Sequence, residues 1–199
     1  MDIGASMAVA AESARAVAQV SRGHWLLVVC AALYLFWWAV FFRPGAQARG
    51  ALRGAAIAAI LLAAVCGVWG LIDAGIALPW IGSVGGVPLW VFAVCGVVAY
   101  AALAGVTQGL FHRQLTTELL LIVLWAAFEL AVACRLGAGA IPMGVAVALL
   151  ILTVVLFVGS MVCYVLYYRL PAWPAFLAGC APLVAVGVEA AAIAVLTSI

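Results

Sequence analysis

Four carboxylates interrupt the long apolar stretches of this sequence, and they are the residues most able to do chemistry. They are Asp73, Glu118, Glu129 and Glu189. A charged group inside a bilayer is costly, so an intramembrane carboxylate is a candidate functional residue. We expect Glu129 and Glu189 to lie deepest and Asp73 to lie at the mouth of a site that they form. Glu118 is expected to form an interfacial ion pair with Arg113.

The fourth apolar stretch places an acidic and an aromatic residue on one helical face. Trp125 lies seven residues after Glu118, and Glu129 lies eleven residues after Glu118. At about 100° per residue, both spacings are close to whole helical turns. A carboxylate one turn from an indole ring could hold a cation through its charge and the ring face. The functional interpretation is therefore a cation or proton site at Glu129 and Trp125. The structural alternative is that Glu129 is protonated, or is paired with Arg135 or a hydroxyl group, and holds helices together.

Two uncharged residues join the predicted binding site, whereas no pattern predicts a catalytic or metal site. Gln108 and Tyr164 each place a large polar group inside an apolar stretch. His24 and His112 are expected on opposite faces of the membrane and cannot share a haem iron, and the six cysteines lack metal-ligand spacing. The sequence contains no HExxH or GxSxG motif and no lysine. We therefore expect neither enzymatic activity nor a cofactor.

The composition restricts the architecture to a polytopic helical membrane protein. Hydrophobic residues make up 71% of the 199 residues, charged residues make up 7%, and the mean hydropathy is +1.39. A soluble domain is about half apolar and a quarter charged, and the strands of a transmembrane barrel alternate in polarity. The net charge of +2 is too small to indicate nucleic-acid binding, so the lipid bilayer is the expected partner.

Six apolar stretches are long enough to cross a bilayer, which requires about 20 residues each. The sequence therefore predicts an all-α fold in which six transmembrane helices form a bundle within a single domain, residues 24–199. The predicted spans are residues 25–42, 54–75, 87–111, 115–134, 142–168 and 172–196.

Residues 1–23 are predicted to form a separate, short amphipathic helix on the membrane surface. The run Ser21-Arg22-Gly23 is expected to end this helix before the first span begins. Its apolar residues follow the spacing of one helical face, at positions Ile3, Met7, Ala10, Ala14 and Val17.

Arginines and small residues predict the orientation and the packing of the spans. Five of the eight arginines fall in the connections after the first, third and fifth spans, which favours a protein whose N- and C-termini both lie outside the cell. A bacterial cytoplasmic (inner) membrane is the expected location. In the second span, Ala55, Ala59, Ala63 and Gly67 recur at every fourth position, which predicts close packing and a central place for this helix.

Together these features favour a small membrane transport protein. It would be a channel or transporter for a small solute, cation-linked or proton-linked, that uses the intramembrane carboxylates. The alternative is a non-transporting membrane subunit that captures a substrate or acts as a scaffold with a partner. An intramembrane lipid enzyme ranks below both, because no pair of nucleophile and base is visible. Either of the first two functions is compatible with a homo-oligomer or a larger membrane complex.

Overall fold

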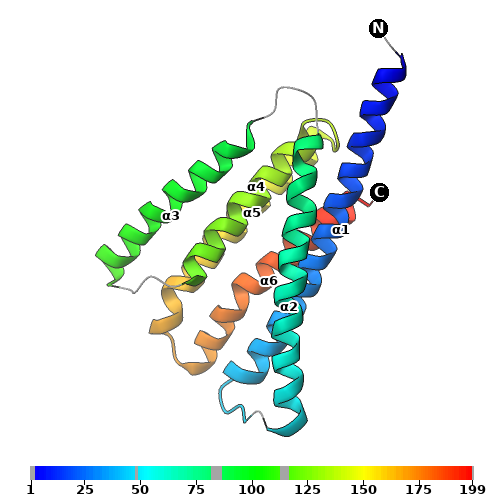
Figure 1. Cartoon of the computed structure of the whole chain (residues 1–199). Helices are drawn as coiled ribbons and strands as arrows, with labels where there is room; N and C mark the ends of the chain where they lie inside the picture. The colour runs from blue at the N-terminus through cyan, green and yellow to red at the C-terminus, as the bar shows by residue number, and fades with distance from the viewer. Residues whose placement is uncertain (1–2, 48, 82–86, 113–116, 199) are drawn as a thin grey trace.

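The computed structural model describes residues 3–47, 49–81, 87–112 and 117–198, and these ranges contain helices and no strand. Six of the helices are long and apolar enough to cross a membrane, which indicates an integral membrane protein. Figure 1 shows them as a bundle of long, roughly aligned helices. They are α1 (Ile3–Phe42), α2 (Gly50–Ala77), α3 (Leu89–Phe111), α4 (Thr117–Gly137), α5 (Met143–Leu166) and α6 (Ala172–Leu196), with short 3₁₀ turns η1 (Leu78–Trp80) and η2 (Tyr167–Arg169).

The helices are packed in the spatial order α2, α1, α6, α5, α4, α3, so α2 and α3 occupy the two edges (Figure 1). The predicted small-residue face of α2 is used, because Ala59 and Ala63 are buried and α2 packs chiefly against α1. The predicted central place of α2 is wrong. Its face of small residues lets one neighbour approach closely, whereas the opposite face exposes large apolar side chains such as Leu61 and Val65.

The predicted amphipathic surface helix is also wrong, since α1 is one long apolar helix that continues through residue 23. Gly23 lies within the helix and does not end it. Because glycine has no side chain, the backbones of α1 and α2 can come into contact at Gly23 and Gly70. The hydroxyl group of Ser21 donates to the carbonyl of Ala194 in α6 at 3.0 Å. Arg22 pairs with Asp73 in α2. The polar run that resembles a helix end in the sequence therefore holds α1 to its neighbours.

At about 1.5 Å per residue, the 40 residues of α1 are far longer than a bilayer core of about 30 Å. Accordingly, the N-terminal turns of α1 extend beyond the neighbouring helices (Figure 1).

Two apolar clusters hold the bundle at opposite ends. The first joins α1, α2, α4, α5 and α6 near the chain termini, where Val20, Leu136 and Ile193 are fully buried. The second joins α3, α4 and α5 at the other end, around Leu119 and Tyr164. The polar and aromatic groups described below lie between and beside these clusters, on the inner faces of α1, α4, α5 and α6.

Candidate functional site: an aromatic pocket and a buried polar cluster

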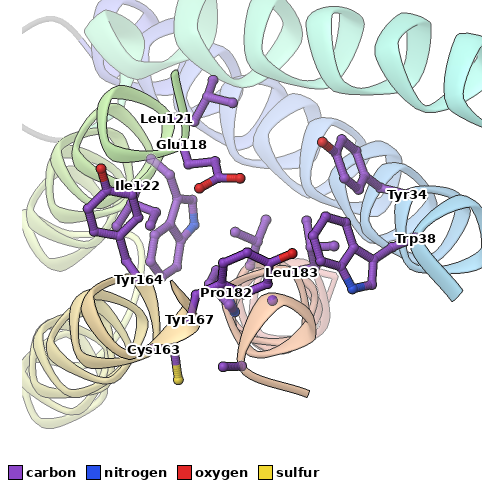
Figure 2. Close-up of a pocket in the computed structure, with 14 residues that line it drawn as sticks. Tyr34, Trp38, Glu118, Leu121, Ile122, Cys163, Tyr164, Tyr167, Pro182 and Leu183 are labelled. Atoms are coloured by element: carbon purple, nitrogen blue, oxygen red, sulfur yellow. The ribbon is translucent and has the colours of Figure 1, made fainter. Parts of the chain in front are cut away.

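A pocket lies between α1, α4, α5 and α6, in the half of the bundle where α1 ends and α4 begins (Figure 2). It contains about 790 Å³ of empty space, counting the part that is open to the outside. Its wall combines aromatic rings with aliphatic side chains and residues of α6. The aromatic residues that line it are Tyr34, Trp38, Trp125, Tyr164 and Tyr167.

Helical spacing brings these rings together. Tyr34 and Trp38 are one turn apart on α1, and Tyr164 and Tyr167 are one turn apart where α5 passes into η2. Several contacts hold the Trp38 indole. Its N–H donates to the Phe176 carbonyl at 3.3 Å, and its ring stacks on the ring of Phe42 with 4.3 Å between the centroids. These contacts fix one wall of the pocket before any ligand arrives.

Glycine and proline shape the α6 side of the pocket. A Cβ atom at Gly179 would collide with the ring of Trp38, so glycine is what allows the indole to lie against the α6 backbone. Pro182 lies inside α6 and has no N–H, so it cannot donate the usual helical hydrogen bond to the carbonyl of Ala178. Both Pro182 and Ala178 line the pocket. The α6 wall therefore offers a carbonyl oxygen that lacks its helical partner.

Glu118 is the one charged residue among the described residues that line the pocket. Figure 2 shows its carboxylate directed into the space between α4 and α1, across from Tyr34 and Trp38. The expected partner of Glu118, Arg113, lies outside the described residues. A carboxylate and aromatic rings that face each other attract a cation, because the carboxylate is negatively charged and the ring faces have a negative electrostatic potential.

A second polar site lies deeper in the bundle, where His24 of α1 meets Glu129 of α4. Both side chains are completely buried, and His24 Nε2 lies 3.1 Å from Glu129 Oε2. The other ring nitrogen, Nδ1, lies 2.8 Å from the carbonyl of Val20. The imidazole also stacks against Phe128, with 6.2 Å between the ring centroids. The pairing of Glu129 is thus real, although its partner is His24 and not Arg135.

Glu189 of α6 extends this site toward α5. It is also completely buried, and one of its oxygens contacts the hydroxyl group of Thr153. His24, Glu129 and Glu189 are close enough to interact electrostatically. One oxygen of each carboxyl group, Glu129 Oε1 and Glu189 Oε2, has no hydrogen-bond partner among the described residues. We call these three residues, together with Thr153, the buried polar cluster.

The last predicted carboxylate, Asp73, forms a separate ion pair on the α1–α2 side. Arg22 Nε and an Nη atom donate to its two oxygens at 2.8 and 3.0 Å. This two-bond geometry is typical of a strong arginine–carboxylate pair. Both carboxylate oxygens are therefore satisfied, which leaves Asp73 a structural role between two helices.

The structure thus distributes the six predicted site residues over four places. Trp125 and Tyr164 line the aromatic pocket, Glu129 and Glu189 belong to the buried polar cluster, and Asp73 forms its own ion pair. Gln108 is exposed on α3, away from all three.

Sequence reasoning missed His24 and the aromatic residues of α1. The i, i+4 spacing of Tyr34 and Trp38 was a readable signal for a shared aromatic face. Glu118 was assigned to an interface, although it shares the helical face of Trp125. No group of three or more His, Cys, Asp or Glu residues in the described ranges is arranged to hold a metal ion.

Comparison with protein-family models, curated proteins and solved structures finds no match for this chain. The chemistry of the two sites is therefore the guide to function.

Proposed function

We propose that this protein is a small membrane transport protein, a channel or transporter, for a small organic cation that binds in the aromatic pocket. The observation that carries this proposal is the combination of five aromatic rings with the carboxylate of Glu118 in one pocket. A cation over the face of an aromatic ring gains about 0.5–2 kcal/mol, and the gain is larger where water is excluded. A neutral solute would lack the charge–charge attraction to Glu118.

The position of the pocket also supports a transported solute. Its walls come from four helices that span the bilayer, so a ligand there lies inside the membrane profile and not on a loop.

The proposal includes the orientation of the protein in the membrane. The pocket lies toward the end of the bundle that carries Arg43, Arg53 and Arg169. In bacterial inner membranes the arginine-rich end faces the cytoplasm. We therefore propose an inner-membrane protein with both termini outside the cell and with a pocket nearer to the cytoplasmic side.

A pair of isosteric probes tests the cation site. Choline carries a quaternary ammonium group, and 3,3-dimethylbutanol has nearly the same shape without the charge. We expect choline to raise the melting temperature of the purified protein, because a ligand stabilises the state that it binds. The neutral alcohol should have little effect. Choline uptake into proteoliposomes that contain the protein should exceed uptake into empty vesicles.

Substitution of Glu118 tests whether choline binds in the aromatic pocket. Glu118→Gln keeps the shape and removes the charge, and it should weaken choline binding by about ten- to thirtyfold, equivalent to about 1.4–2 kcal/mol. Glu12→Gln removes an exposed carboxylate of α1 and serves as the matched control. Equal shifts from choline and the alcohol, or unchanged choline affinity in Glu118→Gln, would refute the proposal.

A specific observation keeps the alternative of a non-transporting subunit open. Helix α3 packs chiefly against α4 and exposes Gln108 in its last turn, next to a broad apolar face. Gly105 and Gly109 lie on this helix with no other part of the structure near them. A glutamine on a lipid-facing surface is stabilised by pairing with another helix. If Gln108→Leu causes an oligomer to dissociate, or a co-purifying protein to be lost, α3 forms the surface that binds the second copy or the partner protein.

A further inference from the structure

The buried polar cluster contains three ionisable side chains, and the hydrogen-bond contacts indicate how many protons it holds. His24, Glu129 and Glu189 are each completely removed from solvent. Without any added proton, a neutral imidazole and two carboxylates would place two negative charges in an apolar interior, which is very costly.

The first proton lies between His24 and Glu129. The carbonyl of Val20 can only accept, so His24 Nδ1 must carry the hydrogen of that 2.8 Å contact. The 3.1 Å contact between His24 Nε2 and Glu129 Oε2 is then a hydrogen bond only if one further proton lies on either atom. Whichever atom holds it, this pair contains one shared proton and is neutral overall.

The contacts of Thr153 favour a second proton on Glu189. The Thr153 hydroxyl group contacts both the Leu149 carbonyl, at 3.0 Å, and Glu189 Oε1. Its single hydrogen cannot satisfy both oxygens fully. Both contacts become full hydrogen bonds when Glu189 is protonated and donates to Thr153, which then donates to Leu149. With this second proton the cluster has no net charge.

Glu189 is the group that can lose its proton with least disturbance. When its O–H bond breaks, the Thr153 hydroxyl group can turn from the Leu149 carbonyl and donate to the new carboxylate instead. The shared proton of His24 and Glu129 has no comparable substitute. Loss of the Glu189 proton leaves one negative charge, which a nearby cation would stabilise.

We propose that the buried polar cluster is a proton-binding site and that a cation in the aromatic pocket displaces the proton of Glu189. This coupling rests on the proposed function, whereas the proton site itself does not. In the exchange one proton leaves Glu189 for the solvent and one positive charge binds in the pocket, so the charge of the bundle interior is unchanged.

Two helices connect the pocket to the cluster. On α4, Glu129 lies one turn beyond the pocket residue Trp125. On α6, Glu189 lies one turn beyond the pocket residue Val186. The indole N–H of Trp125 and Glu129 Oε1 are a donor and an acceptor without partners among the described residues, and they are one turn apart.

The other charged groups of the neighbouring helices have little influence on the charge of Glu189. On the α1–α2 side, Arg22 and Asp73 neutralise each other. On α5, the cluster is faced by the uncharged Thr153. On α4, Arg135 lies more than one turn beyond Glu129, toward the end of the helix. The charge of Glu189 is therefore governed mainly by His24, Glu129 and any cation in the pocket.

Calorimetry of choline binding tests the coupling. Titrations in two buffers of different ionisation enthalpy give the number of protons released for each choline bound. For the wild-type protein we expect release approaching one proton, and in the acidic range an affinity that rises about tenfold per pH unit. Glu189→Gln, which mimics the protonated acid, should still bind choline but release no proton and show no such pH dependence. Glu12→Gln should behave like the wild type.

Infrared spectroscopy of the protein without ligand tests the proton site separately. The wild-type protein should show a protonated-carboxyl band of Glu189 that disappears at high pH and is missing in Glu189→Gln, and Glu129→Gln identifies any carboxyl band that comes from Glu129. If choline does not bind, the proposed function fails, but this band still decides whether Glu189 holds a proton. The same band in Glu189→Gln as in the wild type would overturn the proton site. Choline binding without proton release would overturn the coupling.

Thr153→Val provides a second variant in case Glu189→Gln does not fold. Valine has nearly the shape of threonine but cannot donate a hydrogen bond to the deprotonated carboxylate. We therefore expect the carboxyl band to persist to higher pH than in the wild type. A residue with only a packing role would leave this titration unchanged, and an unchanged titration would contradict the proposed role of Thr153.

Discussion

The crossing of α1 and α2 at Gly23 gives a quantitative test of the fold. A Cβ atom at Gly23 would lie 2.7 Å from the carbonyl oxygen of Gly70 and 2.9 Å from the nitrogen of Ala74. Both are backbone atoms, and ordinary van der Waals contact begins at 3.4 Å, so the helices must separate by about 0.7 Å. Overpacking costs about 1–3 kcal/mol, whereas alanine gains up to about 1 kcal/mol over glycine within a helix. We expect Gly23→Ala to destabilise the protein by about 1–2 kcal/mol.

Unfolding in mixed micelles with increasing SDS measures this free energy. The matched control is Gly54→Ala in α2, because a Cβ atom there meets nothing within 4 Å. This control should be as stable as the wild type, or slightly more stable. Equal stability of the two alanine variants would refute the close crossing. Because His24 follows Gly23 directly, the shifted α1 should also weaken the contact between His24 and Glu129.

Two further predictions concern the pocket wall and the buried pair. Gly179→Ala should push the Trp38 ring into the pocket and lower the affinity for choline about tenfold by calorimetry; Gly144→Ala, at an open position, should leave it unchanged. His24→Leu leaves Glu129 without its partner and should cost about 1–3 kcal/mol of unfolding free energy. Adding Glu129→Leu should recover most of this loss, and a double variant as unstable as the sum of the two single variants would contradict the pairing.

The six helices were predictable from the sequence because their signal is local. A run of about 20 apolar residues without charge has one stable form in a bilayer, a helix that satisfies its own backbone. The end of the first helix was not predictable in this way. Ser21, Arg22 and Gly23 are typical of a chain turn, and only the approach of α2 and α6 shows that they are contacts between helices.

The candidate sites could be predicted only in part, for a related reason. The sequence placed Glu118, Trp125 and Glu129 on one face of α4, but it could not say which other helices meet this face. The structure separates them: Glu118 and Trp125 face the pocket, whereas Glu129 meets His24. Spacing within one helix is local information, and the partner across the bundle is not.

The contrast between two kinds of buried carboxylate supports a functional role for the cluster. A carboxylate that only joins helices is best served by full pairing, as Asp73 is by the two hydrogen bonds from Arg22. Within the described part of the chain, Glu129 and Glu189 each leave one buried oxygen without a hydrogen-bond partner, which costs stability that an apolar side chain of similar size would not. Replacing His24, Glu129 and Glu189 together with leucine leaves no member of the cluster without its partner, so it should preserve or increase stability while it abolishes proton release. A cluster that can be dispensed with for stability but is needed for proton release is what a site for proton exchange requires.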